Sequence, residues 1–110
     1  MNAKKSFISN LQDRLVRHYE ANLEVEMDIT KKVEHIASIQ AYSEAINFIK
    51  TDCTIDEFED FLIHKRRDYD RVMLDVEGDI DFLLTAICKK KGEVFESILD
   101  YSEYYWKGVD

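Results

Sequence analysis

Apolar residues recur at steps of three and four along the first 22 residues, and this spacing predicts an amphipathic helix over about residues 4–21. The apolar face comprises Ile8, Leu11, Leu15 and Tyr19. The following stretch, 23–29, alternates apolar with acidic residues, which is typical of a strand, but a lone strand has no partner for its backbone hydrogen bonds. We therefore interpret this stretch as a helix with a change of phase, or as a kinked junction.

A helical pattern returns from residue 29 and continues to residue 49. Its apolar positions are Ile29, Val33, Ile36, Ile39, Tyr42, Ile46 and Ile49. Their mean step of about 3.3 residues is nearer the 3.5-residue repeat of a coiled coil than the 3.6 residues of a straight helix. Two arrangements stay open: a pair of helices, or one continuous rod of roughly 45 residues and about 70 Å.

The clearest local signal in the chain is a capping box at 54–57. The hydroxyl of Thr54 can accept from the amide of Glu57, whose carboxylate can reach back to the amide of Thr54. Cys53 and Phe58 stand at the positions of a hydrophobic staple. The helix that follows is expected to end at Gly78, and its apolar face comprises Ile55, Phe58, Leu62, Tyr69, Val72, Met73 and Val76.

Two shorter helices are predicted after Gly78. The first spans 80–91, with Asp79 as its cap and Gly92 at its end, and the second runs from residue 93 to about residue 106. Three glycines and no proline also argue against a turn-dense β-sandwich. We therefore predict an all-α fold, a single domain over 1–110. It is a bundle of four to five helices with a long N-terminal helix pair, for which coiled-coil packing is an open alternative.

The net charge of −8 is unevenly distributed. Residues 1–22 carry four bases and two acids, a net of +2, which leaves −10 for the remaining 88 residues. This balance disfavours direct binding to nucleic acid, where affinity depends on Lys and Arg contacts with phosphates. It favours a basic protein partner.

The sequence predicts a cytoplasmic protein. It shows no secretory signal and no apolar run of membrane-spanning length, so we expect no membrane association. Cys53 and Cys88 are expected to be reduced thiols that behave as small buried apolar residues.

Four aromatic residues near the end of the chain are candidates for an interface: Tyr101, Tyr104, Tyr105 and Trp106. Consecutive helix positions fan around the axis, so one helix cannot bury all four side chains on one side. Tyr and Trp are enriched in interface hot spots. The alternative is simple packing of a terminal helix on the core.

Four acids step by three, four and three along the last predicted helix: Glu93, Glu96, Asp100 and Glu103. We expect this row to form a solvated acidic surface. The alternative uses Glu57 and Asp60 together with Glu93 and Glu96 as oxygen ligands for Mg²⁺, as in an all-α nucleotide phosphohydrolase. Those enzymes carry such pairs in the reverse order along the chain, so our leading expectation is that there is no metal site and no cofactor.

Two basic runs raise the question of nucleic-acid binding. Lys65, Arg66, Arg67 and Arg71 alternate with Asp68 and Asp70, which can pair with them along the helix, and Lys89–Lys91 close a predicted helix. The three histidines are scattered along the chain and are expected at surface or boundary positions: His18, His35 and His64.

No nucleophile, metal or phosphate-loop motif stands out, so we expect a protein that is not an enzyme. The leading hypothesis is a non-catalytic protein–protein interaction module: a regulator, inhibitor or assembly factor with a basic partner. A sharper version is an acidic mimic of nucleic acid. Self-association into a homo-oligomer is a further expectation. The alternatives are the Mg²⁺-dependent phosphohydrolase and an accessory protein that binds nucleic acid through Lys65, Arg66, Arg67 and Arg71.

Overall fold

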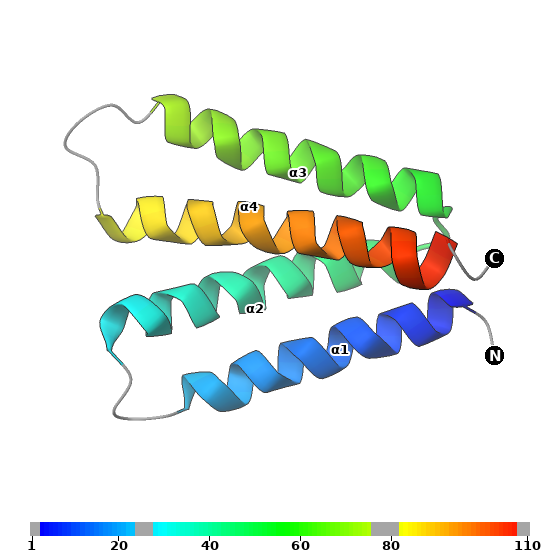
Figure 1. Ribbon diagram of the computed structural model, residues 1–110, viewed down its shortest axis with the longest axis horizontal. Coiled ribbons are helices and arrows are strands. Elements are labelled where there is room, and N and C mark those ends of the chain that lie inside the picture. The colour runs from blue at the N-terminus through cyan, green and yellow to red at the C-terminus, as the bar shows by residue number, and fades with distance from the viewer. Residues whose placement is uncertain (1–2, 24–27, 76–81, 108–110) are drawn as a thin grey trace.

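Helices account for the regular structure of residues 3–23, 28–75 and 82–107, which the computed structural model describes. The elements are α1 (Ala3–Asn22), α2 (Ile29–Ile49), α3 (Ile55–Asp75), α4 (Phe82–Ser102) and a π-helical turn, η1 (Glu103–Lys107). Within these three ranges no strand occurs. The all-α prediction is therefore confirmed, and the arrangement is shown in Figure 1.

α1 and α2 are separate helices, so the single-rod alternative is wrong. Leu23 follows α1 in a turn, with its amide bonded to the carbonyl of Glu20 at 3.2 Å. Asp28 then caps α2, because its Oδ1 accepts from the amide of Lys31 at 3.0 Å. Residues 24–27, which hold most of the alternating stretch, lie outside the described residues.

The buried side of α2 repeats every four residues, which does not support the expected coiled-coil seam. One buried row consists of Val33, Ala37, Ala41, Ala45 and Ile49. Ile29 and Ile36, which the sequence pattern placed on the seam, are 66% and 39% exposed. A row at i, i+4 is the ridge used in ordinary helix packing, and its alanines let α2 approach its neighbours closely.

The capping box at the start of α3 is confirmed. The Thr54 amide donates to Glu57 Oε1 at 3.0 Å, and the Glu57 amide donates to Thr54 Oγ1 at 3.2 Å. Hydrogen bonding to the Glu57 carboxylate, first by the Thr54 backbone amide and then by the Thr54 side chain, holds the pKa of Glu57 below its usual value. The predicted end at Gly78, and the side chains of Val72 and Met73, lie outside the described residues.

α4 continues through Gly92, so the predicted division of the C-terminal third into two helices is wrong. Gly92 is buried against α3, where an added Cβ would lie 3.6 Å from Arg66 Cδ and 3.9 Å from Tyr69 Cβ. Buried Cys88 and Phe95 on either side fix the helix to the core. Gly92 thus lies inside α4 at its contact with α3, where a Cβ would make ordinary van der Waals contacts, and it does not end a helix.

The helices form a fan that is closed at one end. α2 packs on α1 and α4, and α3 packs mainly on α4. In Figure 1, the outer helices α1 and α3 converge near the termini and diverge toward the opposite end. The Cα extents of 47 × 34 × 20 Å describe a flattened molecule.

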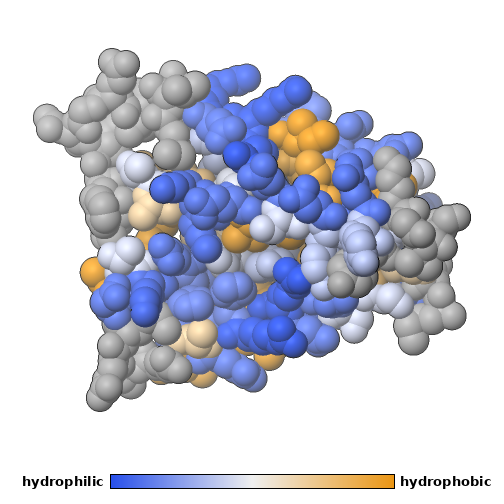
Figure 2. Space-filling view, in the orientation of Figure 1, coloured by the Kyte–Doolittle hydropathy of each residue, from blue (hydrophilic) through white to orange (hydrophobic). Residues whose placement is uncertain are grey.

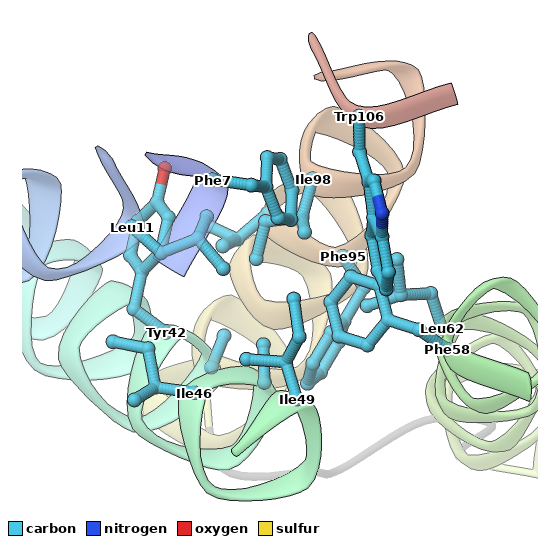
Figure 3. Close-up of a cluster of buried hydrophobic side chains, with 13 residues drawn as sticks. Phe7, Leu11, Tyr42, Ile46, Ile49, Phe58, Leu62, Phe95, Ile98 and Trp106 are labelled. Atoms are coloured by element: carbon cyan, nitrogen blue, oxygen red, sulfur yellow. The ribbon is translucent and has the colours of Figure 1, made fainter. Parts of the chain in front are cut away.

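The hydrophobic core collects residues from all four helices and η1 (Figure 3). Most of them belong to the helix ends that converge near the termini in Figure 1. The largest fully buried apolar members of the core are Phe7, Leu11, Ile49, Phe58, Leu62, Phe95 and Ile98. Among the residues described, no helix is long and apolar enough to cross a membrane.

Candidate functional site

The terminal aromatic cluster divides between core and surface. Trp106 is 5% exposed, and its ring centroid lies 6.0 Å from that of Phe7 and 6.0 Å from that of Phe58. Figure 3 shows Trp106 descending from η1 beside Phe58. Tyr101 is half-buried, while Tyr104 is 74% exposed. The side chain of Tyr105 lies outside the described residues, so Tyr104 is the member of the cluster seen at the surface.

The four acids of the last helix face solvent together. Glu93, Glu96 and Asp100 of α4 and Glu103 of η1 are all exposed; we call them the acidic row. Glu96 forms an ion pair with Arg66 of α3, and Arg66 also approaches Asp70 at 3.5 Å. The acidic row therefore runs along the exposed face of α4, and its charge is partly neutralised at Glu96, which lies next to α3.

The Mg²⁺ alternative finds no shared site for its four acids. α3 and α4 are antiparallel, and Arg66 marks the level of Glu96. Glu57 precedes Arg66 by nine residues on α3, about 13 Å along the axis, and is engaged in the capping box. Among the described residues, no group of three or more His, Cys, Asp or Glu side chains could hold a metal ion.

Three side chains of the two basic runs, Lys65, Arg66 and Lys91, form ion pairs within the molecule. Lys65 and Lys91 approach the carboxylate of Glu44 on α2 at 3.7 and 3.8 Å, and Lys91 also donates to the Tyr69 hydroxyl at 3.0 Å. Arg66 pairs with two acids, as described above. Arg67 and Arg71 are exposed. The predicted pairing along the helix is thus present for Arg66 with Asp70, whereas Lys65 pairs with Glu44 of α2.

An apolar hollow of about 220 Å³ lies between α3 and α4, beside the acidic row. Its apolar lining comprises Leu62, Ile63, Phe95 and Leu99, which we call the apolar groove. Arg66, Arg67 and Glu96 also line it. Figure 2 shows a hydrophobic patch over α3 surrounded by hydrophilic residues.

A second groove separates α1 from α4, with α2 as its floor, and sequence reasoning did not find it. It consists of three hollows of about 500, 210 and 340 Å³ that share residues. Arg14, His18 and Tyr42 line the first two, and Lys90 and Glu93 line the second and third. The charged and titratable basic residues along it are Arg14, Arg17, His18, His35, Lys89 and Lys90, and we call it the basic groove.

Two histidines from different helices meet in the first hollow of the basic groove, and one of them, His18, also lines the second. His18 Nδ1 lies 2.9 Å from His35 Nδ1, and the His18 ring stacks on Tyr42 with a centroid distance of 5.6 Å. Both are half-buried, in keeping with the boundary positions expected from sequence. Their pairing follows from the antiparallel packing of α1 on α2.

Arg14 is fixed beside this histidine pair. Its guanidinium carbon lies 3.8 Å from the centroid of the Tyr101 ring, a cation–π contact. Burial alone would lower the pKa of Arg14, but hydrogen bonds to Tyr42 and Tyr101 outweigh it and raise the pKa above its usual value. Arg14 is therefore a permanent cation held in one place.

The surroundings of His18 favour its neutral form. Burial is the largest cause, followed by the charges of His35, Lys90 and Arg14, and together they lower the pKa of His18. An imidazole crowded by cations gains charge readily only when an anion is near. The basic groove therefore combines fixed positive charge with a site that can take up a further proton.

Large apolar side chains are exposed around the α1–α2 connection. Val16 and Tyr19 of α1 are 52% and 53% exposed, and Leu23 and Ile29 are 79% and 66% exposed. These residues would be available to a second copy of the chain, and the homo-oligomer stays a prediction.

Comparisons with protein-family models, with curated proteins and with solved structures gave no match for this chain.

Proposed function

We propose that this protein is a non-catalytic interaction module that docks a basic segment of a protein partner along the α3–α4 face. The observation that carries the proposal is the position of the acidic row beside the apolar groove. An amphipathic basic segment could place apolar side chains in the groove and its Lys and Arg side chains along Glu96, Asp100 and Glu103. Tyr104, exposed near the end of the row, would extend this surface.

Charge complementarity supports a basic partner over a neutral one. The chain carries a net charge of −8, and all four acids of the row are exposed. Such a surface speeds association with a positively charged patch and disfavours acidic partners. Docking of a protein segment on an exposed surface does not require an enclosed pocket of the kind found in enzymes.

Mimicry of nucleic acid is the sharper form of the proposal. Along the helix axis the acids of the row are spaced about 5 Å apart, given a rise of 1.5 Å per residue. One strand of DNA carries a phosphate about every 3.4 Å. A linear charge density of this order suits the basic surface of a nucleic-acid-binding protein as the partner.

Capture of partners with matched charge-reversal variants tests the proposal. The wild type, an Asp100→Lys/Glu103→Lys variant and an Asp13→Lys/Glu20→Lys control are used as baits for extracts of the native host. All four substituted acids are exposed, so the two variants change net charge equally on different faces. We expect a basic protein that the wild type and the control retain at low salt and the row variant loses.

The captured protein must also behave as the charge argument requires. Its binding should weaken at least about tenfold in the row variant and should fall steeply as salt rises, since exposed charges are screened. A partner that is neutral, that stays bound at high salt, or that the row variant retains would contradict the proposal.

A further inference from the structure

The basic groove concentrates positive charge in an acidic protein. Arg14, Arg17, Lys89 and Lys90 line its hollows, against two carboxylates, Glu34 and Glu93. The local balance is thus +2 before the histidines are counted, on a chain whose total charge is −8. Cations that share a groove repel one another, and a bound anion removes that repulsion.

The histidine pair can add to the positive charge of the groove by taking up a proton. A hydrogen bond between His18 Nδ1 and His35 Nδ1 at 2.9 Å needs a proton on one nitrogen and a lone pair on the other. The pair can therefore carry one additional proton on an outer nitrogen while this contact lasts. The charged and titratable groups that face it are Arg14 and Arg17 on α1, Tyr42 on α2, and Lys90 and Glu93 on α4.

We propose that the basic groove binds a small phosphorylated molecule, with its phosphate between Arg14, His18 and Lys90 and the remainder in the adjoining hollows. These three groups line the central hollow and come from opposite walls, α1 and α4. Donors that converge from several directions suit a tetrahedral oxyanion, whereas a planar carboxylate is best met by one forked guanidinium. The flanking hollows, of about 500 and 340 Å³, are of the size that holds small ligands.

This site is independent of the proposed docking of a basic partner. The basic groove lies between α1 and α4, and the apolar groove lies between α3 and α4. Glu93 borders the basic groove and also begins the acidic row. Loss of phosphate binding would therefore leave the docking proposal untouched if Glu93 is not altered.

Calorimetric titration with defined anions tests the proposal. Inorganic phosphate, sulfate, acetate and a sugar phosphate are compared at equal ionic strength. We expect phosphate and sulfate to bind more tightly than acetate, and the sugar phosphate to bind more tightly than inorganic phosphate. Equal affinities for all four anions would overturn the proposal. Tighter binding of a DNA duplex than of the sugar phosphate would show that the ligand is not a small molecule, and would also overturn it.

Variants identify the groups that hold the phosphate. Lys90→Gln and His18→Gln should each weaken sugar-phosphate binding at least about tenfold, the effect of one lost hydrogen bond to a charged group. Lys5→Gln and His64→Gln remove an exposed cation and an exposed histidine that do not line the groove, and they should bind as the wild type does. Wild-type affinity in both groove variants would contradict the assignment.

The histidine pair predicts a pH dependence. Sulfate does not change its charge between pH 8 and pH 6, so its affinity reports protonation of the protein alone. We expect wild-type sulfate binding to tighten on acidification over this range and binding by His18→Gln to change less. Binding that weakens on acidification, or an identical profile for the variant, would contradict a role for the pair.

Discussion

Trp106 shows how one residue can change the meaning of a sequence pattern. Four aromatics in six positions suggested an interface, but the indole is 5% exposed and fills the space between Phe7 of α1 and Phe58 of α3. Lys4 lies above the same ring at 5.9 Å and donates to the carbonyls of Thr51 and Cys53, each at 2.9 Å. Trp106 thus closes the end of the fan where the helices converge.

Truncation of this side chain should be costly. We expect Trp106→Ala to lower the free energy of unfolding by about 3–5 kcal/mol, because a large buried ring is removed from a packed core. Tyr104→Ala, at a position 74% exposed, should cost less than about 1 kcal/mol. Urea unfolding followed by circular dichroism compares the two variants, and equal stability would place Trp106 outside the core.

His18 makes folding stability depend on pH. Its pKa is lowered in the folded state by burial and then by the charges of His35, Lys90 and Arg14, so the unfolded chain takes up this proton first as pH falls. The stability contributed by neutral His18 is complete above about pH 6.5 and is lost as pH falls below that value.

We therefore expect the wild-type free energy of unfolding to decline between about pH 7.5 and pH 5.5, and to decline less in His18→Gln. His64→Gln, an exposed histidine on α3, serves as the control and should keep the wild-type slope. Urea titrations in low-phosphate buffer over this range provide the measurement. A variant slope as steep as that of the wild type would show that His18 is not the titrating group.

At the scale of helices, the signals carried by neighbouring residues were the dependable ones. The capping box at Thr54, which the sequence predicted, involves residues three apart and forms wherever the local chain turns into a helix. Substitution at such a site has a defined local effect.

Thr54→Ala should lower the free energy of unfolding by about 1 kcal/mol, because the amide of Glu57 loses its acceptor. Thr30→Ala, at an exposed position inside the first turn of α2, is the matched control and should cost nothing. Thermal unfolding measures both. A loss as large for Thr30→Ala as for Thr54→Ala would remove the special role of the cap.

Sequence features whose meaning depends on packing between helices led to wrong predictions. The apolar stripe of α2 was drawn through its largest residues, yet Ala37, Ala41 and Ala45 are fully buried while Ile29 and Ile36 are exposed. Gly92 looked like the end of a helix, because nothing in the local sequence shows that α3 packs against it. Both errors arise from contacts with residues distant in the sequence.

The two candidate sites also differ in whether the sequence alone could predict them. The acidic row could be predicted, because it depends on helical spacing alone. The basic groove could not, since His18 and His35 are 17 residues apart and meet through the packing of α1 on α2. One signal was present: Arg14 and His18 continue, at steps of three and four, the row of apolar Phe7 and Leu11 along α1.

At the scale of the whole molecule, α4 borders both grooves. One side of it meets α1 across the basic groove, and the other meets α3 across the apolar groove, with the acidic row along the exposed face between them. A chain with a net charge of −8 can in this way offer both an acidic and a basic surface. The two proposed ligands, a basic protein segment and a phosphate, occupy different sides of the same helix.

The central claim is that the partner docks on the α3–α4 face. Amide chemical-shift mapping of the labelled chain, titrated with the captured basic partner, tests it most directly. We expect the largest shifts at Ile63, Arg67, Leu99, Asp100 and Glu103, and little change at Asp13 and Glu20 on α1. Shifts concentrated on α1 and α2, with the apolar groove and the acidic row unchanged, would contradict the claim.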